Sequence, residues 1–164
     1  MYNIGDLVMK NHTGICRVEA VAPMEGGGQR LYYTLVPLSD GHSRFYVPTQ
    51  PEPAGIRPVL TEEEGWVLLR EIPGLAPIQI ENEKQREQLY REILRSNDPR
   101  SLAAIVKMLY LREQERAAQG KKPAAMDKSY FQLAEKLLNS ELALALGRQE
   151  SEIPELIRES LENA

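Results

Sequence analysis

Few side chains of this sequence are of a kind and at a spacing that could do chemistry. A run of carboxylates at Glu62–Glu64 could supply a general acid and a general base. Neighbours on a helix point about 100° apart, however, so these carboxylates do not converge on one substrate. The histidines His12 and His42 fall in predicted turns, where we expect ordinary surface side chains. The cysteine, Cys16, falls in a predicted strand, where we expect a small core residue rather than a reactive thiolate.

The three glycines Gly26-Gly27-Gly28 are the remaining candidate for a chemical site, as a phosphate-binding loop. A loop of that kind lies between a strand and a helix and continues into a Lys-Ser or Lys-Thr pair, which this sequence lacks here. We expect a hairpin turn instead. Since the histidines and the cysteine also lack the spacing of zinc ligands, we expect no catalytic residue, no metal and no cofactor.

Composition and charge restrict what the chain could bind. The fractions of hydrophobic (42%) and charged (27%) residues are those of a folded globular protein. The net charge is −4, with five basic and five acidic side chains in residues 1–60 and fifteen basic and nineteen acidic ones after them. No region therefore has the positive excess that finds nucleic acid by charge alone, and any contact with DNA must be local or assisted by a partner.

Location and covalent cross-linking can also be predicted from the sequence. It has no charged segment followed by a signal-peptide core, and no run of about eighteen apolar residues. We therefore expect a cytoplasmic protein without a membrane contact. A single cysteine excludes an internal disulfide.

Binding is then the expected mode of action, and two kinds of element would present the binding surfaces. Residues 1–60 alternate β-branched and aromatic residues with turn residues, which predicts five short antiparallel strands in a small barrel. The strands end at turns around Asn11–Gly14, at the glycine run, at Ser39–His42 and at the bend Pro51-Glu52-Pro53.

From Thr61 onward the pattern changes to that of helices. Thr61 is a predicted N-cap, and Asp98-Pro99 has the order of a cap followed by a first-turn proline. Helical patterns cover about 61–73, 82–95, 98–119, 124–147 and 153–161, and Gly147 is a predicted helix end. We expect Leu89, Ile93 and Leu94 on the buried face of the second helix and Leu102, Ile105, Val106 and Leu109 on that of the third. The fold class is therefore α+β, with a barrel domain at 1–60 and an all-α helical bundle at 61–164.

The ordered series of these segments resembles a known family. The stretches "IGDLVMKNHTGICRVEAV", "YYTLVPL", "FYVPTQ" and "IRPVLT" are similar to the Tudor-like RNA-polymerase-interaction domain of the CarD/CdnL family, which transcription-repair coupling factor shares. "LRSNDPRSLAAIVKMLYLREQER" and "DKSYFQLAEKLLNSELALAL" resemble the helical carboxy-terminal domain of the same family. The resemblance implies a bacterial transcription regulator that binds the RNA polymerase β subunit and contacts promoter DNA to alter open-complex stability.

The resemblance also implies residues for the polymerase contact. The contacting strand positions of the family match Met24 and Tyr46, where other members tend to have arginines. We therefore expect apolar and aromatic contacts, assisted by Arg17 or Arg44, with a weaker contribution from charge pairs. Two other interpretations stay open, a half-buried strand aromatic for Tyr46 and a loose surface side chain for Met24.

For DNA, the resemblance implies a contact at Lys128 and points to an unusual position. Well-known members carry a tryptophan wedge at the stretch that matches "IENEKQRE", where this chain has Asn82-Glu83. The only tryptophan, Trp66, comes about seventeen residues earlier and is predicted to pack. Phosphate contacts could come from Lys84, Arg86, Lys121, Lys122 and Lys128, each of which could equally be a solvated helix side chain. We expect weak DNA binding without sequence specificity, recruitment through polymerase, and a monomer.

Three alternatives to a transcription regulator remain open. A Tudor- or SH3-like peptide-binding adaptor would use the barrel aromatics Tyr32, Tyr33, Phe45 and Tyr46 as a groove or cage. Alternation along a strand sends Tyr32 and Tyr33 to opposite faces, which weakens this alternative. The others are a small-molecule sensor with its pocket between the two domains and an enzyme that uses Glu and His side chains from separate loops.

Overall fold

The computed structural model describes residues 1–51 and 55–163. The chain divides into two compact units, residues 1–59 and 60–164, and each is described here by itself. Residues 52 and 53 of the predicted Pro51-Glu52-Pro53 bend lie outside the described part of the chain.

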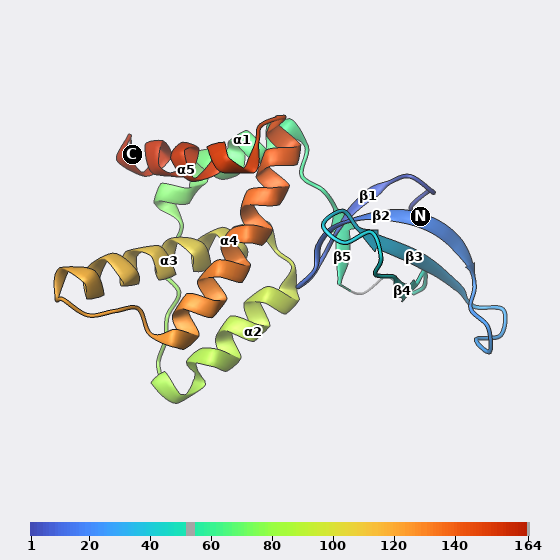
Figure 1. The fold of residues 1–164 in the computed structure, drawn as a ribbon, viewed down its shortest axis with the longest axis horizontal. Coiled ribbons are helices and arrows are strands. Elements are labelled where there is room, and N and C mark those ends of the chain that lie inside the picture. The colour runs from blue at the N-terminus through green and yellow to red at the C-terminus, as the bar shows by residue number, and fades with distance from the viewer. Residues whose placement is uncertain (52–54, 164) are drawn as a thin grey trace. The chain divides into compact units, whose positions relative to one another are not determined.

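The first unit is a curled antiparallel sheet, a half-barrel (Figure 1). Its strands follow the order β4-β3-β2-β1-β5, so that β4 and β5 form the two edges. The alternation of β-branched and aromatic residues with turn residues is the reason this segment forms strands. The predicted fold class is confirmed. The strand bounds are β1 Leu7–Lys10, β2 Gly14–Pro23, β3 Leu31–Pro37, β4 Phe45–Pro48 and β5 Ile56–Pro58.

Left-handed backbone occurs at two of the hairpin turns of the sheet. At the β1–β2 turn, His12 has φ 63° and Gly14, the first residue of β2, has φ 101°. Between β2 and β3, Gly26 and Gly28 have φ 78° and 70°, a conformation that glycine adopts without steric strain. The glycine run is thus a hairpin turn, as the missing helix and lysine in the sequence indicate.

Alternation along the strands separates a core face of the sheet from an outer face. Tyr33 and Leu35 of β3 point into the core, while Tyr32 and Thr34 point the other way. Tyr33 also accepts the backbone N–H of Tyr2 through its hydroxyl at 3.0 Å, which ties the amino terminus to the sheet. The buried core comprises Val8, Cys16, Val18, Tyr33, Leu35 and Val47.

The second unit consists of five α-helices and three short 3₁₀ helices among its described residues. In this unit, α1 and α5 lie side by side near the carboxyl end of α4, and α2 lies near its amino end (Figure 1). The α-helices are α1 Glu62–Glu71, α2 Arg86–Ser96, α3 Pro99–Ala118, α4 Ala125–Leu146 and α5 Ile153–Glu162. The 3₁₀ helices are η1 Ile72–Gly74, η2 Glu83–Gln85 and η3 Glu150–Glu152.

The predicted helix ends are confirmed by their capping contacts. Thr61 and Glu64 form a reciprocal capping box, in which each side chain accepts the other residue's backbone N–H at 3.1 and 3.0 Å. Asp98 accepts the backbone N–H of Ser101 at 3.0 Å at the start of α3. Gly147 ends α4 in the left-handed conformation, with φ 65°.

The predicted apolar stripe is buried on α3, at Leu102, Ile105, Val106 and Leu109, but only partly on α2. Gly65 of α1 lies so close to α4 that an added Cβ would stand 3.0 Å from Leu146 Cδ2, so a larger residue here would require Leu146 to shift. On α2 the prediction was partly wrong. Leu94 is buried, but Leu89 and Ile93 are only half-buried, and two polar residues, Arg86 and Tyr90, are buried in their place.

Candidate functional site

The exposed face of the sheet unit carries the side chains predicted to meet a partner. Tyr46 lies on the edge strand β4, opposite Thr34 of β3, and is 52% exposed. Its neighbour Val47 points into the core, so alternation turns the Tyr46 ring outward. Tyr46 was predicted either to contact a partner or to be a half-buried strand aromatic. Its exposure favours the first interpretation.

The aromatic cage of the adaptor alternative is not formed. Tyr33 is buried at 1% exposure, and Phe45 packs against the core, beneath the ammonium of Lys10, which lies 4.6 Å from the ring centroid. Tyr32 and Tyr46 lie on the opposite face. Four rings divided between two faces cannot line one groove.

The two arginines near β4 differ in how far their charge is compensated. Arg44 Nε lies 3.0 Å from Glu19 Oε2, and Nη1 donates to the carbonyl of Gly41 at 2.7 Å. Glu19 stands at the irregularity in the β2–β3 register between Val18 and Ala20. Arg17 is exposed on β2 and has no ion pair with another described residue. Arg17 is therefore the less compensated cation of this face.

Met24 lies apart from the other three predicted contact residues. It follows the end of β2, is 38% exposed, and accepts the N–H of Gly27 through its carbonyl at 2.9 Å. Ala20 pairs with Thr34, which pairs with Tyr46, so Met24 stands four residues beyond that row. At about 3.3 Å per residue this is roughly 13 Å along the sheet. A partner must therefore extend at least this far along the sheet to contact both Met24 and Tyr46.

The predicted phosphate-contacting lysines are exposed on the helical unit. Lys84 lies in η2, where its backbone N–H is accepted by Asn82 Oδ1 at 3.0 Å. Lys121 and Lys122 lie in the turn between α3 and α4, and Lys128 in the first turns of α4. Exposure leaves all four ammonium groups accessible to an anion.

Arg86 contradicts the prediction of an accessible phosphate contact. It is only 5% exposed, and its Nε and Nη2 both donate to the Glu83 carboxylate at 2.7 Å. Its Nη1 donates to the hydroxyl of Tyr90 at 2.8 Å. The bond from Arg86 in turn lowers the pKa of Glu83. Because the guanidinium is hydrogen-bonded to both Glu83 and Tyr90, Arg86 has a structural role and is not available to a phosphate.

The contacts of Arg86 continue into a polar network that joins three helices. Tyr90 of α2 donates through its hydroxyl to Asp127 Oδ1 at 2.9 Å, and Arg112 of α3 donates through Nε to Asp127 Oδ2 at 2.6 Å. Burial raises the pKa of Tyr90 to about 12, which further favours the protonated hydroxyl that donates to Asp127. Since Asp127 immediately precedes Lys128, the network fixes the first turn of α4 that carries this lysine.

Sequence reasoning missed this network, although a signal was present. Glu83, Arg86 and Tyr90 follow at spacings of three and four, which places them on one side of a helix. Their partners, half-buried Arg112 on α3 and buried Asp127 on α4, could not be paired with them from spacing alone.

The wedge position and the tryptophan are separate, as predicted. Asn82 and Glu83 are exposed and occupied with capping η2 and with pairing Arg86. Trp66 lies half-buried on α1, with the Arg148 guanidinium carbon 5.9 Å from its ring centroid. The indole therefore belongs to the packing around α1.

Two further observations concern the described residues as a whole. In the ranges 1–51 and 55–163, no three His, Cys, Asp or Glu side chains gather in a way that could hold a metal ion. Of the helices described, none is both long and apolar enough to cross a membrane.

Comparison with protein families accounts for nearly the whole chain. The family model described as "CarD-like/TRCF RID domain" matches residues 2–60. The model described as "CarD, C-terminal domain" matches residues 76–158. The first match covers the sheet unit and the second covers α2, α3, α4 and most of α5.

Proposed function

This chain belongs to the CarD family, and we propose that it acts at promoters by holding RNA polymerase through its sheet unit and promoter DNA through its helical unit. The family domains indicate a transcription factor that interacts with RNA polymerase, and the first domain implies interaction with the β subunit. The DNA contact, the effect on the open complex and the absence of catalysis are parts of the proposal.

The outer face and edge of β4 support the polymerase half of the proposal. An edge strand has backbone groups that can pair with a strand of a partner, and Tyr46 adds an exposed aromatic ring beside them. Aromatic side chains and arginines are enriched among residues that dominate binding energy. Arg17 on β2 and Arg44 on the β3–β4 connection add two cations to this unit, and Met24 would contact the partner farther along the sheet.

The exposed lysines of the helical unit support the DNA half. Lys84, Lys121, Lys122 and Lys128 could each contact a phosphate, and such contacts position a protein without reading sequence. Because the chain carries a net charge of −4, these contacts alone would give weak binding. Attachment to polymerase would raise the effective concentration of the lysines near the DNA.

The single observation that carries the DNA contact is the placement of Lys128. Asp127, the residue before it, is held by a buried hydrogen bond from Tyr90 and a partly buried one from Arg112, while the lysine itself is exposed. A rigid turn presents a cation with little loss of entropy on binding.

Charge reversal at Lys128 tests the proposal. With polymerase and a promoter, we expect the Lys128→Glu variant to change the open-complex lifetime less than the wild-type protein does. The difference in lifetime between the two proteins should become smaller as salt increases, because phosphate contacts release counterions. The measurement is the decay of promoter complexes after addition of a competitor, at two or more salt concentrations.

The matched control is Lys136→Glu, which makes the same charge change at another exposed position of α4. An effect of Lys136→Glu as large as that of Lys128→Glu would contradict a local contact. A complete lack of response to either variant would contradict the DNA half of the proposal.

A further inference from the structure

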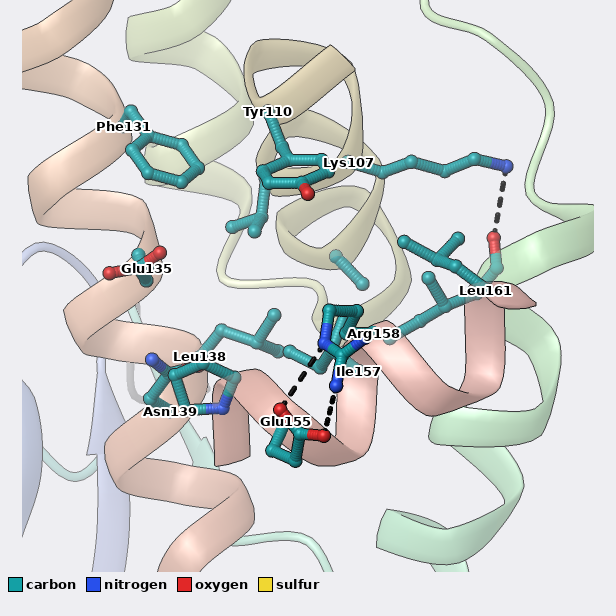
Figure 2. A pocket seen from close by; sticks show the side chains of 14 residues that line it. Lys107, Tyr110, Phe131, Glu135, Leu138, Asn139, Glu155, Ile157, Arg158 and Leu161 are labelled. Carbon is teal, nitrogen blue, oxygen red and sulfur yellow. Dashed lines mark hydrogen bonds and ion pairs between the residues drawn. The ribbon is translucent and has the colours of Figure 1, made fainter. Parts of the chain in front are cut away.

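A cavity of about 220 Å³ lies within the helical unit, between α3, α4, α5 and η1. Most of its wall is apolar, with buried Val106 and Leu138 and half-buried Phe131, Ile157 and Leu161. Figure 2 shows Phe131 and Leu138 along α4, and Ile157 and Leu161 on α5. The wall thus joins side chains from helices that are separate in sequence, and it presents mainly hydrocarbon to whatever enters.

The size of the cavity limits what it can hold. A cavity of about 150 Å³ lined by aliphatic and aromatic side chains binds benzene, so this one has room for one ring with a short substituent. Sites for larger organic ligands start at about 300 Å³. A helix of a partner protein is about 10 Å across, and an extended segment would need hydrogen-bond partners for its backbone, which an apolar wall lacks. The occupant is therefore a small molecule.

The cations at the cavity are already occupied by groups of the protein. Lys107 Nζ donates to the carbonyls of Ile72 and Pro73 at 3.1 and 2.8 Å. Arg158 pairs with Glu155 and donates to Glu162 at 2.8 Å. A carboxylate or phosphate ligand would have to compete with these contacts, so the cavity is poorly suited to an anion.

The polar groups of α4 do not favour a charged ligand either. Asn139 Oδ1 has under 1 Å² of accessible surface, so a ligand in the cavity cannot reach it. The Glu135 carboxylate has no ion pair with another described residue, but it is only half-buried, and water screens its attraction for a cation. An ammonium group would lose hydration against the apolar wall without a buried partner in return.

We propose that this cavity binds a neutral, apolar organic molecule of about one ring, which contacts Phe131, Leu138 and Ile157. Such a ligand gains free energy by leaving water, and it has no charged group that must be paired inside. It would also add van der Waals contacts to α4 and α5 together, and so stabilise the folded helical unit.

Three one-ring probes that differ in a single substituent test the ligand class. We expect toluene to shift the methyl NMR signals of Val106 and Leu138 in the full-length protein saturably, with a Kd on the order of 1 mM or tighter. Benzoate should bind at least about tenfold more weakly, and benzylammonium should bind no more tightly than toluene. Benzoate binding as tight as that of toluene, or tighter binding of benzylammonium, would overturn the proposed class. Absence of a saturable shift by toluene up to its solubility limit would overturn the site.

Two variants of α5 locate the contacts. Ile157→Asn and Leu161→Asn each place a polar amide in the wall at a half-buried position, and each should weaken toluene binding about tenfold. The matched control is Leu133→Asn, the same kind of change at an exposed position of α4 outside the cavity, which should leave the affinity unchanged. Unchanged affinity in both α5 variants, or an equal loss in Leu133→Asn, would overturn the site.

A second readout separates ligand contact from a general loss of structure in the α5 variants. Ile157→Val keeps the wall apolar and should bind toluene with an affinity close to that of the wild-type protein. Toluene should raise the unfolding temperature of the wild-type protein, Ile157→Val and Leu133→Asn, because it binds the folded state, and should raise that of Ile157→Asn much less. Equal increases in all four proteins would show that toluene acts elsewhere and would overturn the proposal.

Discussion

Individual side chains of this protein divide by burial into those that hold the fold and those that can meet a partner. Arg86 and Arg44 illustrate the two cases. The guanidinium of Arg86 is enclosed between Glu83 and Tyr90, whereas Arg44 and its partner Glu19 are exposed at 38% and 51%. Exposed ion pairs contribute little stability, so a polymerase surface could replace the Arg44–Glu19 pair at low cost.

Cys16 gives a prediction about pH. It is fully buried in the sheet core, and burial raises the pKa of its thiol to about 11 from an ordinary value of 9.0. The unfolded chain therefore loses this proton first as pH rises. The stabilising contribution is complete below pH 9 and is lost between pH 9 and pH 11, with a decrease in the free energy of unfolding of roughly 2 kcal/mol at pH 11.

The comparison that isolates this effect is Cys16→Val, which keeps an apolar side chain of similar size in the strand. Urea unfolding at pH 8 to 11, followed by circular dichroism, should show a smaller loss of stability in the variant. The difference between the two proteins is the informative quantity, because the other titrating groups are common to both. Parallel pH curves would show that the thiol does not contribute.

At the scale of elements, η2 and the start of α2 form the segment where the family resemblance implies a tryptophan wedge against DNA. A tryptophan inserted against a base step holds it open by stacking, and the matching position here has Glu83, whose carboxylate instead pairs with Arg86. The segment of η2 and the start of α2 thus contributes to internal packing through the Glu83–Arg86 pair and has no tryptophan that could act as a wedge.

Glu83→Trp should lengthen the open-complex lifetime several-fold, because base stacking on an aromatic ring contributes about 1–3 kcal/mol. The substitution also removes the partner of the buried Arg86 guanidinium. Glu83→Ala is therefore the control, since it removes the same carboxylate and adds no ring. Equal lifetimes with both variants, measured by competitor challenge on one promoter, would contradict a role for stacking at this position.

Helix bounds and caps were predictable from local patterns, and the polar interior was not. The capping box at Thr61, the cap at Asp98 and the end at Gly147 depend on residues within one turn of each other. The burial of Tyr90 and Asp127 depends on partners 37 residues apart in sequence. Periodicity assigns polar residues to the solvent face, and for this reason Arg86 was placed there.

At the scale of the whole molecule, the proposal assigns polymerase binding to the sheet unit and DNA contact to the helical unit. The sheet unit offers an edge strand with an exposed aromatic ring, and the helical unit offers exposed lysines, of which Lys128 lies on a rigid turn, and an apolar cavity. The sequence predicted the order of the units and the accessible lysines from periodicity and from family resemblance. The cavity was not predictable, since its wall joins residues of η1, α3, α4 and α5.

The central claim is that the sheet unit holds RNA polymerase through the face and edge of β4, and binding of the full-length protein to purified polymerase without DNA tests it most directly. We expect saturable binding at micromolar concentration or below, and about tenfold weaker binding for Tyr46→Ser, because truncating an interface aromatic commonly costs more than 1 kcal/mol. Leu144→Ser, which shortens an exposed apolar side chain of α4, should leave the affinity unchanged. Absence of binding at micromolar concentration, or equal affinities of the two variants, would contradict the account.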